Sequence, residues 1–61
     1  MFELCDKVKI RSNDIVGTIV DISNIDGHNI YIVESDVANA LGGYGGVWKL
    51  FDCYEDDIEK V

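Results

Sequence analysis

The sequence has no proline, a single histidine and only five basic residues, and the shortage of basic residues excludes a class of protein. Twelve acidic residues give a net charge of −7, so we do not expect a general nucleic-acid binder, because such proteins neutralise phosphates with Lys and Arg. No run approaches the roughly 20 apolar residues that cross a membrane. The two cysteines, Cys5 and Cys53, form no CxxC pair, and secreted domains of this size usually carry several disulfides.

Length and composition set what the chain is able to build. Its 61 residues suffice for one domain, residues 1–61, with one small core. The apolar share of 48% is too high for a disordered acidic tail. The first residues have neither a basic start nor an apolar stretch, so we expect no signal peptide. The sequence therefore predicts a small cytoplasmic domain with two thiols.

Short apolar runs separated by turn residues predict an all-β fold. Strict alternation in Lys7–Ile10 puts Val8 and Ile10 on one face of a strand. The run Ile15–Ile22 is apolar on both faces, which is typical of a bent strand, and Gly17 suits a bend or the close approach of another backbone. The expected strands are residues 6–11, 15–23, 29–34, 47–53 and 58–61.

The connections and the core complete the expected fold. Asp26-Gly27 is a hairpin signal, and Tyr54–Asp57 is short enough to form one 3₁₀ turn. A last strand that pairs with the first would close the sheet, so the fold class is a small five-stranded SH3-like barrel with one 3₁₀ turn before the last strand. The expected core is Val8, Ile10, Ile19, Ile22, Val33, Leu50 and Ile58.

The residues of the first three strands resemble a KOW-type SH3-like barrel. Asp6–Ile10 is similar to the opening strand of that group, although Cys5 stands where its glycine would be. Gly17-Thr18-Ile19 is similar to the central strand, and Tyr31–Glu34 to the third. The chain also resembles small uncharacterised SH3-like proteins of bacterial and mobile-element origin. The resemblance implies this fold and contacts with RNA or protein.

A glycine-rich segment interrupts the strand pattern. Gly42–Gly46 holds four glycines, which lose too much backbone entropy to order as a strand, so we expect a loop. Tyr44 at its centre is a candidate anchor, because tyrosine offers a large contact area with few rotamers to freeze. Trp48 and Phe51 lie on opposite faces of the expected fourth strand, so one of them is expected at the surface. Trp48 is thus a candidate both for the core and for partner contact.

Carboxylates gather at the end of the chain. They lack the glycine-centred spacing of a calcium loop, so no metal site is expected, and two interpretations stay open. One is a solvated acidic surface, and the other is a docking face for a basic partner, because charge complementarity speeds association. The predicted binding residues are Tyr44, Trp48, Asp52, Glu55, Asp56, Asp57 and Glu59.

No motif predicts catalysis. The sequence has no nucleophile–base pair, metal triad or phosphate loop, so we expect neither catalytic residues nor a cofactor. His28 is expected in a solvated hairpin turn. The interpretation that fits best is a non-enzymatic interaction module with a protein partner. One alternative is an inhibitor whose carboxylates mimic nucleic acid, and a second is a KOW-like RNA contact through Lys7, Lys9 and Arg11.

Overall fold

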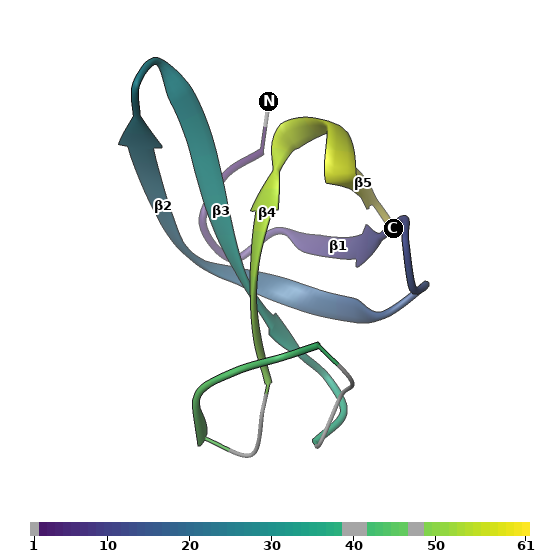
Figure 1. The fold of residues 1–61 in the computed structure, drawn as a ribbon. Coiled ribbons are helices and arrows are strands. Elements are labelled where there is room, and N and C mark those ends of the chain that lie inside the picture. Colours follow the sequence, from purple (N-terminus) through teal and green to yellow (C-terminus); the bar gives the residue numbers. More distant parts are fainter. Residues whose placement is uncertain (1, 39–41, 47–48) are drawn as a thin grey trace.

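The computed structural model describes residues 2–38, 42–46 and 49–61. Their strands are β1 (Lys7–Ile10), β2 (Val16–Ile25), β3 (His28–Ser35), β4 (Leu50–Tyr54) and β5 (Ile58–Lys60). A 3₁₀ turn, η2 (Glu55–Asp57), joins β4 to β5. The all-β fold and the 3₁₀ turn before the last strand are therefore confirmed (Figure 1). No helix in the described part of the chain has the length and apolar character needed to cross a membrane.

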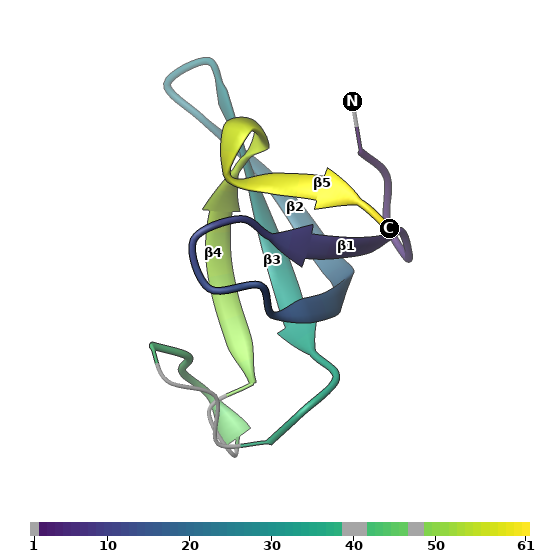
Figure 2. The same ribbon diagram turned by 90° about the vertical axis from the view of Figure 1, so that its right-hand side faces the viewer.

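The strands pair antiparallel in one sheet, in the order β4-β3-β2-β1-β5. The last strand pairs with the first, as predicted, with Lys9 opposite Glu59 and Ile10 opposite Ile58. Strands β4 and β5 are the two ends of this order, and within the described residues no ladder joins them, so the sheet is not closed by hydrogen bonds. Figures 1 and 2 show β1 and β5 crossing β3 and β4 at a steep angle.

The long strand β2 pairs with β1 along its first part and with β3 along its length, although these partners cross, because β2 bends at a bulge. Its register with β3 shifts between Ile19 and Asp21, which leaves Val20 as the extra residue. A bulge bends the strand that carries it and increases its twist. The predicted bend is thus confirmed, but it lies at Val20, and Gly17 serves the other expected purpose. A Cβ atom on Gly17 would lie 2.4 Å from the carbonyl oxygen of Glu34, so only glycine allows β2 and β3 to approach here.

Beyond the bulge, β2 and β3 form an extended hairpin, residues 21–32, which we call the hairpin arm. Its turn is Asp26-Gly27, with φ angles of 53° and 81°. Positive φ at both central residues is the signature of a type I′ turn, whose twist matches that of paired strands. The arm ends with Ile25 opposite His28. The sequence signal Asp-Gly therefore placed this turn correctly.

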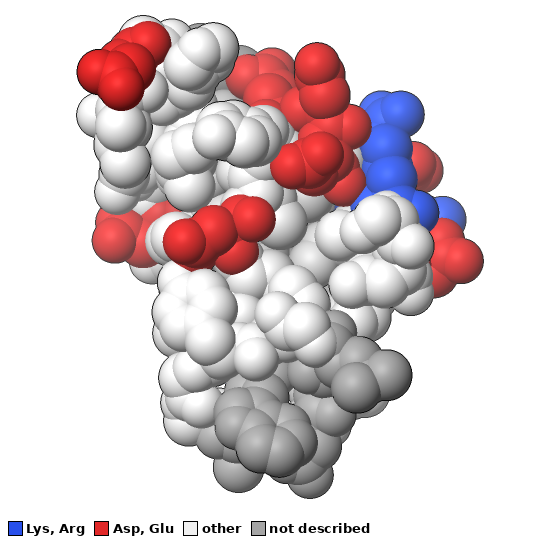
Figure 3. Space-filling model, in the orientation of Figure 1, with Lys and Arg blue, Asp and Glu red and all other residues white. Residues whose placement is uncertain are grey.

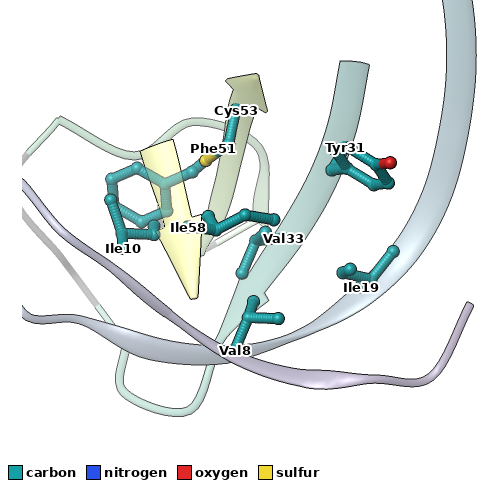
Figure 4. Close-up of a cluster of buried hydrophobic side chains, with 8 residues drawn as sticks. All are labelled: Val8, Ile10, Ile19, Tyr31, Val33, Phe51, Cys53 and Ile58. Atoms are coloured by element: carbon teal, nitrogen blue, oxygen red, sulfur yellow. The ribbon is translucent and has the colours of Figure 1, made fainter. Parts of the chain in front are cut away.

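Among the described residues, eight buried side chains form one apolar core between the crossing strands (Figure 4). Of the predicted core residues, Val8, Ile10, Ile19, Val33 and Ile58 are buried, and Ile22 is partly buried against them. Tyr31, which was not predicted in the core, is fully buried. The ring of Phe2 packs edge to face against the ring of Tyr31, with their centroids 5.5 Å apart.

The fourth strand corrects two predictions. It spans Leu50–Tyr54 and does not include Lys49, whereas residues 47 and 48, where the predicted strand begins, lie outside the described part of the chain. Phe51 and Cys53, rather than Leu50, point into the core. Leu50 is half-buried on the opposite face. Both faces of this strand carry apolar residues, so alternation alone does not decide which one is buried.

Candidate functional site

Two of the predicted binding residues, Tyr44 and Asp52, meet at the outward face of β4. Asp52 and Tyr54 alternate with the buried Phe51 and Cys53, so their side chains face away from the core. The hydroxyl of Tyr44 donates a hydrogen bond to the Asp52 carboxylate. That bond to a negatively charged acceptor is the largest cause of a raised pKa of the Tyr44 phenol. Tyr44 and Asp52 therefore form one unit on the surface.

The glycine loop is attached to the edge of β4. The amide of Tyr44 donates to the carbonyl of Leu50 at 2.9 Å, and the amide of Leu50 donates back at 2.8 Å. A Cβ on Gly45 would lie 2.9 Å from the Leu50 side chain, so this glycine lets the loop rest on Leu50. End strands invite pairing with other chains unless something covers them. The loop thus protects part of this edge and presents the ring of Tyr44, 45% exposed, in a defined place.

The acidic turn η2 follows directly at the end of β4. The Asp57 carboxylate accepts a hydrogen bond from the Tyr54 amide at 2.9 Å, which fixes the turn against the strand. The buried Tyr31 donates its hydroxyl proton to Glu55 through a long hydrogen bond of 3.4 Å. The Asn29 side chain donates to that same hydroxyl oxygen, also at 3.4 Å. These bonds link the turn to the hairpin arm.

An open hollow of about 540 Å³ separates the tip of the hairpin arm from η2. Its walls are Gly27, His28 and Asn29 on one side and Tyr54, Glu55, Asp56 and Asp57 on the other. The rings of His28 and Tyr54 meet edge to face, with their centroids 6.1 Å apart. Tyr54 is 57% exposed. The hollow is therefore lined by the exposed rings of His28 and Tyr54 and by carboxylates, and by no Lys or Arg among the described residues.

One of the predicted binding residues, Glu59, faces away from this surface in the structure. Glu59 lies on β5, where its carboxylate meets the Arg11 guanidinium at 3.7 Å. It lines a second hollow together with Phe2, Arg11 and Lys60, and Glu55 and Asp56 of η2 line both this hollow and the first. Trp48 lies outside the described residues.

The charges are divided between two sides of the molecule. In the described part of the chain, Lys7 and Lys9 on β1, Arg11 in the turn that follows it and Lys60 on β5 form ion pairs with Asp36, Asp14, Glu59 and Asp6. These pairs use four of the five basic side chains and four of the twelve acidic ones. The excess negative charge consequently falls on the other carboxylates.

We call one group of these carboxylates, on β2, β3, β4 and η2, the acidic face. Its members are Asp21, Glu34, Asp52, Asp56 and Asp57. Within the described residues, none of the five pairs with a Lys or Arg. Figure 3 shows acidic side chains spread over the face that carries β4 and η2, and the Lys and Arg side chains visible in this view lie at the edge near the C-terminus.

The two cysteines differ in their surroundings. Cys53 is buried in the core, and this burial, followed by the charges of Asp57 and Asp52, raises the pKa of its thiol to about 11. The thiolate is the reactive form of cysteine, so Cys53 is inert at neutral pH. Cys5 is exposed. Among the described residues, no group of His, Cys, Asp and Glu is arranged to hold a metal ion.

Sequence reasoning missed Tyr54 and His28 as surface residues of interest. Tyr54 was assigned to a connector, whereas it is the last residue of β4 and faces outward. His28 opens β3 rather than lying in the turn. Residues 51–54 alternate between the two faces of the strand. Once Phe51 is assigned to the core, this alternation predicts that Tyr54 faces outward. Comparison with protein-family models, with curated proteins and with solved structures finds no match for this chain.

Proposed function

We propose that this chain is an SH3-like domain, similar to KOW-type domains, that works as a non-enzymatic module and binds a basic protein partner. The fold assignment is supported by a first strand that lies between the second and the last. It is also supported by the bend in β2 and by a 3₁₀ turn before the last strand. The contact surface is the acidic face together with Tyr44 and Tyr54.

The observation that carries this proposal is the separation of charge. Lys7, Lys9, Arg11 and Lys60 are matched by nearby carboxylates, so they contribute little net field. The acidic face keeps its charge and carries exposed tyrosines, which supply apolar contact area and a polar tip. Complementary charge steers the encounter of two proteins, while aromatic anchors contribute most of the binding energy.

The same observations bear on the two alternatives. A mimic of nucleic acid needs carboxylates spaced along an exposed face like phosphates, whereas a docking module needs an apolar centre. On the outer face of the sheet, the apolar Ile32 lies between the carboxylates of Asp21 and Asp52 on the neighbouring strands. This mixture of apolar and acidic side chains favours the docking module. Contact with RNA through Lys7, Lys9 and Arg11 is disfavoured, because each of them already has a carboxylate partner.

The test begins with capture of partners from an extract of the source cells on the immobilised full chain. The affinity of each purified partner is then measured by calorimetry at low and at high salt. We expect a basic protein whose binding weakens as salt rises. Asp56→Asn should weaken binding about twofold or more and flatten its salt dependence. The matched control is Asp14→Asn, on the side where the charges are paired with Lys9.

Tyr44 provides an independent arm of this test. Tyr44→Ala should weaken partner binding about fivefold or more, with little change in melting temperature, because the loop's backbone bonds to Leu50 remain. A variant that melts much earlier yet binds normally would make Tyr44 a structural residue. Capture of nucleic acid at physiological salt, or of acidic proteins alone, would overturn the proposed function.

A further inference from the structure

The outer face of the hairpin arm and β4 carries apolar side chains that the core does not use. Tyr31 and Val33 on β3 point into the core, so Ile30 and Ile32, which alternate with them, face outward and are half-buried. Cross-strand register places Ile30 opposite Tyr54 on β4. At the tip of the arm, Ile25 lies on this same face, opposite His28.

We call this row of side chains the apolar strip: Ile25, Ile30, Ile32 and Tyr54. Ile25 and Tyr54 are 58% and 57% exposed. Single exposed apolar residues are ordinary on a soluble protein, but a contiguous group on one face marks an interaction surface. At the start of β4 the glycine loop rests on Leu50, and the strip ends there. The strip therefore has a defined length along the outer face.

Carboxylates border the strip on both sides. Asp21 on β2 and Asp52 on β4 both lie opposite Ile32, one on each neighbouring strand. Asp56 and Asp57 border the hollow beside Tyr54. An apolar centre with a charged rim is the usual anatomy of a protein interface. Here the rim is acidic on both sides, which specifies the charge of whatever covers it.

We propose that the apolar strip is the docking site of a basic amphipathic segment of a partner protein. The segment's apolar side chains would lie on Ile30, Ile32 and Tyr54, and its Lys or Arg side chains would meet the flanking carboxylates. This inference rests on the proposed function and adds to it the chemistry of the partner. A second copy of this chain is a poor occupant, because it would bring like charges of the same rim together. The net charge of −7 also repels an anionic membrane surface.

The experiment uses the full chain, labelled with ¹⁵N, and three synthetic peptides of equal length. The first alternates leucine with arginine, the second alternates serine with arginine, and the third alternates leucine with glutamate. We expect the leucine–arginine peptide to bind about tenfold more tightly than the serine–arginine peptide. Its amide shift changes should centre on residues 30, 32 and 54. The leucine–glutamate peptide should not bind.

Variants separate docking from damage to the fold. Ile32→Thr keeps the β-branched shape of the side chain and should weaken the leucine–arginine peptide several-fold while leaving the serine–arginine peptide unchanged. Tyr54→Ser, at an exposed position, should do the same if Ile32→Thr proves to melt early. Val61→Ser, at the exposed end of the chain beyond β5, is the matched control and should change neither affinity.

The outcomes distinguish this inference from the proposed function on which it rests. Equal affinity for the two arginine peptides, with shifts confined to η2, would overturn the apolar strip and leave an acidic docking face standing. Tight binding of the leucine–glutamate peptide would overturn the charge argument for both. Shifts at residues 30 and 32 that depend on protein concentration alone would identify a second copy as the occupant and overturn the inference. No binding by any peptide would count against both proposals.

Discussion

At the scale of single residues, Cys5 holds a conformation that suits glycine. Its φ angle is 72°, in the left-handed region, where a side chain costs about 1–2 kcal/mol. Its amide nevertheless donates to the carbonyl of Ile19 at 2.8 Å, so the turn is fixed by the pairing of the N-terminal segment with β2. This is the position where the resemblance to KOW-type domains implies glycine, and the backbone gives the physical reason.

Cys5→Gly is therefore expected to stabilise the protein relative to Cys5→Ala by about 1 kcal/mol in the free energy of unfolding. Both variants remove the exposed thiol, but only glycine relieves the backbone. Chemical denaturation of the two variants side by side measures the difference. If alanine proved as stable as glycine, Cys5 would not be strained.

The buried thiol of Cys53 predicts a loss of stability at high pH. Its pKa is raised from 9.0 to about 11 in the folded state, chiefly by burial, so the native protein favours the neutral thiol. The unfolded chain loses this proton first. The stabilisation is present in full below about pH 9 and disappears as the pH rises through about 11.

Urea denaturation between pH 8 and 11.5 tests this sign. We expect the free energy of unfolding of the native sequence to fall more steeply with pH than that of Cys53→Ala. Cys5→Ala, which removes the exposed thiol, should keep the native slope. A Cys53→Ala variant with an unchanged slope would mean that other groups cause the loss.

At the scale of elements, alternation determined the first three strands more firmly than the fourth. In β1 the charged side chains of Lys7 and Lys9 leave only one face for the core, and the structure follows that assignment. The bulge at Val20 was not predictable, because it reflects how a long strand reconciles two partners that cross. In β4 both faces offered apolar residues, so Leu50 was assigned to the core in place of Phe51.

Gly17 joins two elements at their closest approach, so its replacement should disturb the whole sheet. Gly17→Ala would bring a methyl group against the Glu34 carbonyl oxygen and the Val33 side chain. We expect a loss of about 2–3 kcal/mol or more in the free energy of unfolding. The control is Gly46→Ala, where nothing lies within 4 Å of the added Cβ. Thermal melts that shift equally for the two variants would contradict the close approach.

At the scale of the whole molecule, the sequence predicted an acidic surface but not its location. Asp52, Asp56 and Asp57 were expected to act together, and β4 and η2 do bring them to one end of the sheet. Glu59 was grouped with them because it is close in sequence, but β5 turns it toward Arg11, in the turn after β1. The apolar strip could not be predicted, because it depends on the cross-strand register of the hairpin arm and β4.

The separation of charge makes opposite predictions for two carboxylates of the same chain. Asp36 pairs with Lys7 at 2.7 Å, so Asp36→Asn should lower stability by a few tenths of a kcal/mol, which is the usual contribution of an exposed pair. Asp56 lies between Glu55 and Asp57 in η2, so Asp56→Asn should relieve repulsion and raise stability by a similar amount.

On a domain of this size such changes correspond to melting shifts of about 1–3 °C in opposite directions. Both shifts should shrink when thermal melts at 10 mM salt are repeated at 500 mM, because salt screens attraction and repulsion alike between exposed charges. Shifts of the same sign at low salt would mean that the excess charge is spread evenly over the surface. In that case the acidic face would lose the electrostatic distinction on which the proposed recognition of a basic partner rests.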